Sequence, residues 1–433
     1  MAFSTIRRRK WRVSCCLTDM ALLNSATLEF VRSHADEDVR HLAFLADRFP
    51  GVDMPAALDQ IRGRQVAKVK IPAWAAVDGI VYPPHLSLEQ CSGEAAARYK
   101  ARLARRLGVQ SLVDLTGGMG VDFSWMAREV SQATYVERQE WLCALAKENF
   151  PRLRLSHVEV RQGEAEALLP ALPAVDLIYL DPARRDSKGG KTYAISDCVP
   201  DVSLLKEGLL RHARWILVKL SPMLDWHAAV EAMRCELGGV SEVHVVSSGN
   251  ECKELLLLLS ADAPDAPRLY CVNDDVCFSY DTQRAFPPLV YGVPRVGDML
   301  LVPNASVMKA GCFTAFASRF HSRAIAPSSH LFFIPAEEAS GDGFATGMPA
   351  RCFRVDGVTS FNKKALRQAL VGVSRANVAV RNFPLTAAEL RKRLRLDDGG
   401  DVFIFATTTS ERQHVLLVCR KVPDAGKIHE NQP

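Results

Sequence analysis

Apolar residues near the start of the chain recur at helical spacing. The intervals are three, four and seven residues, at Leu28, Val31, Val39, Leu42, Leu45 and Phe49. This pattern predicts helical structure over residues 24–63, with Pro50 and Gly51 as a stop. The stretches KIPAW and YPPHLS then break the pattern. We therefore expect an N-terminal helical domain over about residues 20–85.

From residue 86 onward, short apolar runs alternate with helical patterns. The expected parallel strands are residues 111–116, 133–138, 157–162, 175–181 and 215–221. Such alternation predicts a parallel sheet with helices on both faces. Two further runs, 241–248 and 251–259, have the spacing of a hairpin, so the last strand is expected to be antiparallel. This pattern predicts an α/β domain over residues 86–262.

The pattern changes again after the proline-rich stretch 261–267. Strand-like runs occur at residues 276–280, 330–335, 402–408 and 414–419, and helix-like runs at 363–371 and 386–396. This mixture predicts a C-terminal α+β domain over residues 263–421. The helical spacing turns Leu390, Leu394 and Leu396 partly inward and leaves neighbouring basic residues outside.

Composition places the chain among ordinary globular proteins. Of its 433 residues, 48% are hydrophobic and 24% are charged. The longest strongly apolar run, Leu255 to Leu259, is far short of a membrane-spanning helix, so no membrane crossing is expected. The twelve cysteines lack the paired spacing of a zinc site, which indicates reduced thiols, a cytoplasmic protein and no structural metal.

Positive charge is concentrated near both ends of the chain. Residues 351–396 hold eleven lysines and arginines against two acids, and residues 1–12 hold five with no acid. Such segregation suits contact with a polyanion, although a solvated helix face has the same composition. No apolar segment follows the basic N-terminus as in a secretory signal, which leaves a disordered extension or a mitochondrial presequence.

Acidic residues follow successive strands of the expected sheet. Asp114 ends the first strand and is followed by a turn through Gly117, Gly118 and Gly120, which suits a close approach of backbone to a ligand. Phe123 stands where a dinucleotide site has its third glycine. Glu137 ends the second strand, where a carboxylate can accept both hydroxyls of a ribose. Glu164 and Asp181 follow the next two strands, with Glu164 placed to meet an adenine amino group, so all four acids are expected at one edge.

These motifs resemble the class I S-adenosylmethionine-dependent methyltransferases over residues 86–262. The resemblance implies a Rossmann-like seven-stranded sheet with an antiparallel last strand, and S-adenosyl-L-methionine as cofactor. Its implied cofactor-binding residues are Asp114, Thr116, Gly117, Gly118, Gly120, Asp122, Glu137, Arg138 and Glu164.

A narrower resemblance covers most of the chain. The stretches EQCSGEAAARYK, DLTGGMGVD, DPARRD, KLSPMLD, NECKEL and RNFPL are similar to those of a bacterial methyltransferase group with a C-terminal THUMP-like domain. Because THUMP domains accompany RNA-modifying enzymes, the resemblance implies tRNA or rRNA as partner. The segment EQCSGEAAARYK resembles one that closes over the cofactor, which makes Gln90, Ser92 and Lys100 candidate contacts.

The candidate catalytic residues are Asp181 and Pro182, at the end of the fourth strand. Methyltransferases acting on exocyclic amines often continue with a proline and an aromatic residue, whereas this chain continues with Ala183 and Arg184. Asp181 can orient an amine and accept its proton, or only steady the methionine end of the cofactor. A nucleophilic cysteine is the minor alternative, with Cys198 and Cys252 as candidates.

Basic residues beside this motif are candidates for substrate binding. Arg184, Arg185, Lys188 and Lys191 can hold phosphates, or the arginines can brace the loop by pairing with Asp181 or Asp186. Further candidates are Lys219, Ser221, Asn250 and Lys253. Arg381, Asn382 and Phe383 of the RNFPL turn can bind a phosphate and stack a base.

Three functions remain open from the sequence. The first is methylation of a nucleotide in structured RNA. The second is methylation of a small molecule or a protein, with the basic segment unrelated to the substrate. The third is RNA binding without catalysis. The sequence leaves the oligomeric state undetermined.

Overall fold

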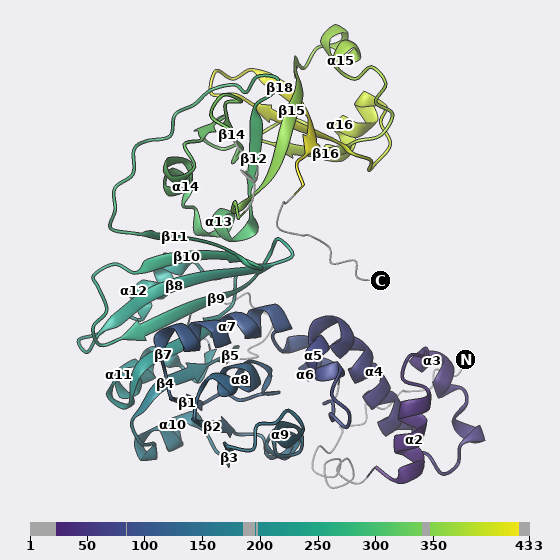
Figure 1. Ribbon diagram of the computed structural model, residues 1–433, viewed down its shortest axis with the longest axis vertical. Helices are drawn as coiled ribbons and strands as arrows, with labels where there is room; N and C mark the ends of the chain where they lie inside the picture. The colour runs from purple at the N-terminus through teal and green to yellow at the C-terminus, as the bar shows by residue number, and fades with distance from the viewer. Residues whose placement is uncertain (1–22, 84, 185–194, 196–197, 340–346, 424–433) are drawn as a thin grey trace, which may run out of the picture. The chain divides into compact units, whose positions relative to one another are not determined.

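The computed structural model describes residues 23–83, 85–184, 195, 198–339 and 347–423, without the side chains of residues 85–87 and 184 (Figure 1). The chain divides into two compact units. The first comprises residues 1–220, 229–239 and 258–262, and the second comprises the remainder. None of the helices described is both long enough and apolar enough to span a bilayer.

The N-terminal region is helical, as the sequence pattern predicts. The elements are α2 (Ser25–Ser33), α3 (Val39–Ala43), the 3-10 helix η2 (Ala46–Arg48), α4 (Met54–Lys70), α5 (Pro72–Ala75) and α6 (His85–Gln90). Within residues 24–63 the helices are separate, because Asp38 and Asp53 accept hydrogen bonds from backbone N–H groups and begin new helices. Phe30, Leu42 and Ile61 are buried in the core of this region.

Residues 74–82 connect this region to the central helices. The Trp74 side chain is fully buried, and its Nε1 donates to Ser124 Oγ at 3.2 Å. The Asn149 side chain accepts from the backbone N of Val81 at 2.9 Å and donates to its carbonyl at 2.8 Å. These bonds satisfy polar groups that lie inside the first unit.

The central elements alternate strand and helix, as the sequence predicts. The strands are β1 (Ser111–Asp114), β2 (Gln132–Glu137), β3 (Val158–Gln162), β4 (Val175–Leu180), β7 (Ala213–Leu220), β8 (Gly239–Ser248) and β9 (Glu251–Ser260). The helices are α7 (Glu94–Leu107), α8 (Val121–Met126), η3 (Ala127–Glu129), α9 (Glu140–Arg152), α10 (Ala165–Leu168), η4 (Leu169–Ala171), α11 (Val202–His212) and α12 (Trp226–Ala232). After β4, a short ribbon pairs β5 (Ala183–Arg184) with β6 (Cys198–Val199).

The sheet includes the seven strands that the sequence predicts, with two additional strands. Among the residues described, nine strands lie in the order β11-β10-β8-β9-β7-β4-β1-β2-β3 (Figure 1). β1 is parallel to β2 and β4, and β4 is parallel to β7. Gly249 and Asn250 both have positive φ in the two-residue turn between β8 and β9, which makes β9 the predicted antiparallel strand. The additional strands, β10 (Arg268–Asn273) and β11 (Val276–Asp281), follow the stretch at which the sequence predicts a domain boundary.

The C-terminal α+β part is built on a second sheet. Its strands lie in the order β13-β14-β12-β15-β18-β17-β16, and β16 is parallel to β17 whereas the other pairs are antiparallel. Their bounds are β12 (Met299–Pro303), β13 (Arg323–Ala324), β14 (Phe332–Ile334), β15 (Ala350–Ser360), β16 (Asn377–Arg381), β17 (Val402–Thr408) and β18 (His414–Lys421). The helices are α13 (Ala305–Ala310), α14 (Phe313–Arg319), α15 (Lys363–Ala369) and α16 (Ala387–Leu394).

Both faces of this second sheet are buried. Phe405 of β17 belongs to one apolar cluster, whereas its neighbours Ile404 and Ala406 belong to another. Such alternation places successive side chains on opposite faces of the strand. Leu390 of α16 is buried in the second cluster and Leu394 packs against it, as their helical spacing predicts. Leu396 is buried in the same cluster, although it lies beyond the end of the helix.

Candidate active site

The predicted row of acids lies at the carboxyl ends of neighbouring strands in the first unit. Asp114 is the last residue of β1, Glu137 is the last residue of β2, and Asp181 directly follows β4. Because β1 lies between β2 and β4 and is parallel to both, these three acids share one edge of the sheet. This is the edge at which ligands of open α/β sheets bind.

The glycine turn after β1 is held between two residues of β2. Gly118 has a φ of +54°, and a side chain at Gly117 would begin 2.2 Å from the ring of Tyr135. The Tyr135 hydroxyl donates to the Gly118 carbonyl, and the backbone N of Gly118 donates to Glu137 Oε2 at 2.9 Å. The other oxygen of Glu137 accepts from the backbone N of Gln139 at 2.8 Å. The turn and the buried Glu137 carboxylate therefore form one fixed structure.

Asp114 lies beneath this turn with only 1% of its surface exposed. The backbone N and the hydroxyl of Thr116 both donate to Asp114 Oδ1, at 2.8 and 3.2 Å. Burial raises the pKa of Asp114 well above its ordinary value, and the negative charges of Asp122 and Asp181 add to this effect against the bonds from Thr116. Asp114 is therefore a carboxyl that a bound cation would help to ionise.

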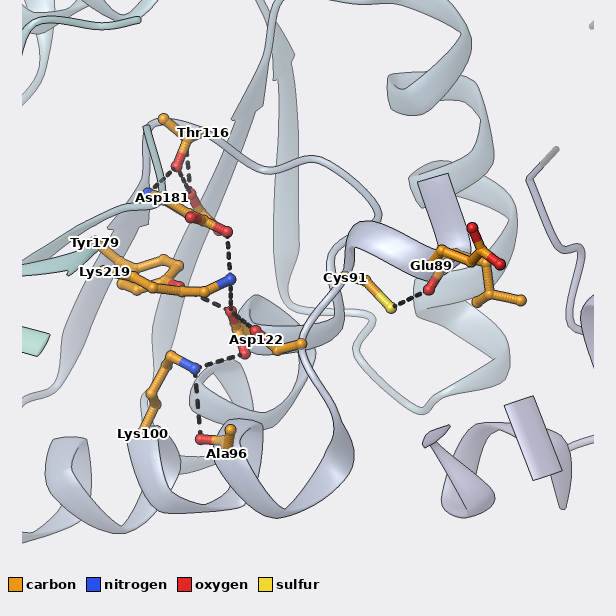
Figure 2. Close-up of polar contacts among 12 residues, drawn as sticks. Glu89, Cys91, Ala96, Lys100, Thr116, Asp122, Tyr179, Asp181 and Lys219 are labelled. Atoms are coloured by element: carbon orange, nitrogen blue, oxygen red, sulfur yellow. Dashed lines mark hydrogen bonds and ion pairs between the residues drawn. The ribbon is translucent and has the colours of Figure 1, made fainter. Parts of the chain in front are cut away.

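Asp122, at the start of α8, is the centre of a buried polar network (Figure 2). Its Oδ1 lies 3.1 Å from Nζ of the fully buried Lys100, and its Oδ2 accepts from Ser92 Oγ at 2.7 Å and from the Tyr179 hydroxyl at 2.8 Å. Burial alone would raise the pKa of Asp122. The charges of Lys100 and Lys219, with the two hydroxyl bonds, outweigh burial and lower this pKa to about 2. Asp122 is therefore ionised at neutral pH.

Lys219 lies between the carboxylates of Asp181 and Asp122 (Figure 2). Its Nζ is 2.6 Å from Asp181 Oδ2 and 3.8 Å from Asp122 Oδ2. The backbone N of Asp181 donates to the Thr116 hydroxyl at 2.6 Å, which connects Asp181 to the glycine turn. The Asp181 side chain is 39% exposed, whereas that of Lys219 is 14% exposed. The solvent-accessible carboxylate of Asp181 is thus oriented by the mostly buried ammonium group of Lys219.

The remaining residues of the predicted cofactor site and catalytic motif differ in how far they are exposed to solvent. Arg138 and Glu164 are exposed next to the ends of β2 and β3, and Gly120 has a φ of +80° at the start of α8. Pro182 is buried. The side chain of Arg184 and all of Arg185, Lys188 and Lys191 lie outside the described part of the chain, so their expected phosphate contacts stay predictions.

The other predicted substrate residues lie in the second unit and already contact their own neighbours. Asn250 Oδ1 accepts from the backbone N of Ala305 at 2.9 Å, and Lys253 Nζ lies 2.5 Å from Glu251 Oε2. The backbone N of Met223 donates to Ser221 Oγ at 3.3 Å. Arg381 is exposed at the end of β16. Their roles toward a substrate stay predictions.

The contacts of Phe383 and of Arg391 differ from those that the sequence predicts. Phe383 packs edge-on against Phe361 and His414, at 5.1 and 5.4 Å between ring centroids, so its ring takes part in the C-terminal core instead of standing free for a base. Arg391 is only 29% exposed and pairs with Asp398 at 2.9 Å. Arg391 is therefore not part of the outward basic face that helical spacing predicts for α16.

The cysteine alternative gains no support from the described residues. Cys198 is buried, and burial raises the pKa of Cys252, which is the opposite of what a nucleophilic thiolate requires. Within the described part of the chain, no group of three or more histidine, cysteine or acidic side chains could hold a metal ion.

The sequence pattern did not indicate a role for Tyr179, and it indicated Lys100 only as a possible cofactor contact. Tyr179 occurs inside the apolar run of β4, where a buried tyrosine needs a partner for its hydroxyl. Lys100 lies on the buried face of α7 with Ala96 and Ala104. Because lysine is rarely buried without a partner, the position of Lys100 on an apolar helix face could have indicated a buried ion pair.

Comparison with protein families identifies two segments of the second unit. Residues 350–421 match a model described as THUMP domain-like, and residues 300–337 match a model described as a ferredoxin-like domain. No curated protein matches the sequence significantly.

Solved structures include a relative that spans almost the whole chain. A protein from Porphyromonas gingivalis W83, described as a "putative methyltransferase", is 30% identical, with 93% of this chain and 98% of that chain covered and a TM-score of 0.78. An O-methyltransferase from Bacillus cereus in complex with S-adenosylhomocysteine is 14% identical, over 51% and 97% of the two chains, with a TM-score of 0.31. A "putative RNA methyltransferase" from Pyrococcus horikoshii is 15% identical, over 46% and 96%, with a TM-score of 0.33. At these low TM-scores, the last two do not bear on the activity of this chain.

Proposed function

This chain belongs to the family of class I methyltransferases with a C-terminal THUMP-like domain, and from that premise we propose that it methylates a nucleotide of structured RNA. We propose S-adenosyl-L-methionine as the methyl donor and tRNA or rRNA as the substrate. The observation that carries the proposal is the fixed arrangement of Asp114, the glycine turn and Glu137 at one sheet edge.

The residues at this edge fit S-adenosylmethionine. The positive φ of Gly118 and the tight contact of Gly117 with Tyr135 keep side chains out of the turn, so a ligand can approach the backbone there. Glu137, already held by two backbone N–H groups, would accept the ribose hydroxyls. Glu164 would face the adenine amino group, and Asp114 would face the cationic methionine end. When bound, the donor supplies a methyl group on a positively charged sulfur.

Asp181 is the proposed catalytic residue. Methyl transfer requires mainly that nucleophile and methyl group be held in line, and such positioning is worth roughly 7–11 kcal/mol. The bond from its backbone N to Thr116 and the ion pair with Lys219 fix Asp181 beside the cofactor turn. Pro182, buried next to it, restricts the backbone at the same point.

The proposal of an RNA substrate is supported by the C-terminal part. The THUMP-like match at residues 350–421 includes the whole basic segment, residues 351–396, that is predicted to contact a polyanion. Lys392, Arg393 and Arg395 are exposed on or next to α16, and Arg381 is exposed at the end of β16. Contacts of this kind lose strength steeply as salt increases, because binding releases counterions from the phosphates.

The test begins with calorimetry of S-adenosylmethionine binding. Wild type is expected to bind the cofactor, Glu137→Ala to lose most of the affinity, and the exposed control Glu148→Ala to match wild type.

Total RNA from cells with and without the gene is then digested to nucleosides for mass spectrometry. Disappearance of one methylated nucleoside without the gene is the expected result. Cofactor binding with an unchanged set of RNA nucleosides would instead favour a small-molecule or protein substrate, and no cofactor binding would contradict the proposal.

A further inference from the structure

The nucleophile of the proposed reaction can be inferred from the charge next to Asp181. Lys219 Nζ lies 2.6 Å from Asp181 Oδ2, so an ammonium group adjoins the candidate catalytic carboxylate (Figure 2). The second neighbour of Lys219, Asp122, is itself held by Lys100, Ser92 and Tyr179. The cation is therefore supported by a buried network and stays near the reacting centre.

A fixed cation affects the two common nucleophiles in opposite ways. An amine becomes positively charged as it takes up a methyl group, so a neighbouring ammonium raises the energy of that transition state. A hydroxyl oxygen becomes more negative as it gives up its proton, so an ammonium that donates a hydrogen bond to it lowers the energy. The position of Lys219 therefore favours an oxygen nucleophile over a nitrogen nucleophile.

The chain after Pro182 points to the same choice. Ala183 follows, and it pairs with Val199 in the two-stranded ribbon of β5 and β6. A methyl side chain in a paired strand provides no flat surface on which a base could lie while its amino group is presented. A ribose hydroxyl needs no such surface, because it can be placed through contacts with the sugar and phosphate.

We propose that the methyl acceptor is the 2′-hydroxyl of an RNA ribose, polarised by Lys219 and deprotonated by Asp181. This inference rests on the function proposed above. The hydroxyl proton passes to the Asp181 carboxylate as the oxygen attacks the methyl carbon. The oxygen–carbon bond forms while the carbon–sulfur bond breaks, and its electron pair goes to sulfur, which gives S-adenosylhomocysteine. Lys219 keeps its protons, and Asp181 returns its proton to water.

Alkaline hydrolysis of the labelled product tests the site of methylation. Wild type is incubated with S-adenosylmethionine carrying a tritiated methyl group and with total RNA from cells that lack the gene. Alkali cleaves RNA through the free 2′-hydroxyl, so a 2′-O-methyl group protects the adjacent bond and leaves its label in a dinucleotide. Label in alkali-stable dinucleotides is the expected result. Label in mononucleotides would overturn the ribose assignment while leaving RNA methylation intact, and RNA without label would overturn both.

Variants of Lys219 test its role separately. Lys219→Met is expected to lower kcat about 100-fold, the size of effect seen when a donor to a developing oxyanion is removed. Its affinity for S-adenosylhomocysteine should remain close to wild type, whereas its melting temperature should fall, because Asp122 and Asp181 lose a neighbouring cation. Lys219→Arg, which keeps the charge, should recover part of the rate, and the exposed control Lys147→Met should match wild type. Full activity of Lys219→Met, or a loss explained entirely by weaker ligand binding, would overturn the role given to Lys219.

Discussion

The ion pair between Lys100 and Asp122 leads to a quantitative prediction about stability. Lys100 has no exposed side-chain surface, and the Asp122 side chain is 10% exposed. Folding lowers the pKa of Asp122 from 3.8 to about 2. At 1.4 kcal/mol for each unit of pKa, the ionised carboxylate contributes about 2 kcal/mol to the stability of the first unit at neutral pH.

Lys100→Met removes the cation that lowers this pKa most. The variant leaves a buried carboxylate whose desolvation is no longer offset, so the expected loss of unfolding free energy at pH 7 is about 3–5 kcal/mol. The control Glu148→Gln breaks an ion pair between side chains that are 47% and 37% exposed. Its expected cost is about 1 kcal/mol or less.

Because the chain has two compact units, the assay must report on the first alone. Hydrogen exchange of peptides from α7 and α8 across a urea series, read by mass spectrometry, meets this need. The stabilising contribution of Asp122 is complete above pH 4 and declines as pH falls toward 2, since its pKa is lower in the folded state. The difference between Lys100→Met and wild type should therefore shrink over that range. A loss below 1 kcal/mol at pH 7, or one unaffected by acid, would refute the reasoning.

Three further predictions concern the glycine turn and its surroundings. Asp114→Asn should raise the melting temperature of the ligand-free protein, because the amide oxygen keeps both bonds from Thr116 without a buried charge, and calorimetry should show weaker binding of S-adenosylmethionine. Gly117→Ala places a methyl group 2.2 Å from the Tyr135 ring, so its melting temperature and cofactor affinity should both fall. Burial raises the pKa of Cys91 to about 11, so iodoacetamide at pH 8 should alkylate it more slowly than the exposed Cys277, as peptide mass spectrometry would measure.

The edge of the sheet that carries the site could be predicted from the sequence. The runs ending at Asp114, Glu137 and Asp181 are apolar strands of one parallel sheet, and parallel strands bring their carboxyl ends to one edge. Local pattern and sheet geometry were sufficient for this step. The hairpin before Glu251 was equally accessible, because Gly249-Asn250 is the kind of pair that a tight turn requires.

The partners of side chains at that edge could not be predicted in the same way. The sequence predicted that Lys219 faces the substrate, but it did not indicate that the ammonium group of Lys219 pairs with Asp181 and lies near Asp122. These residues are far apart in sequence, and strand periodicity does not determine which charges meet across a sheet. Likewise β10 follows a proline-rich stretch that indicates a boundary, yet it hydrogen-bonds to β8. Propensity predicts a strand but not its neighbour.

The contacts of residues 74–82 affect how the protein can be shortened or recombined. Trp74 fills the interior beside Ser124, and Val81 satisfies both polar ends of the Asn149 side chain. A fragment that started at the change of periodicity near residue 86 would lack the indole and expose apolar surface on α8 and α9. The helices before residue 86 therefore form part of the interior of the first unit, and they are poor candidates for exchange with another protein as a self-contained module.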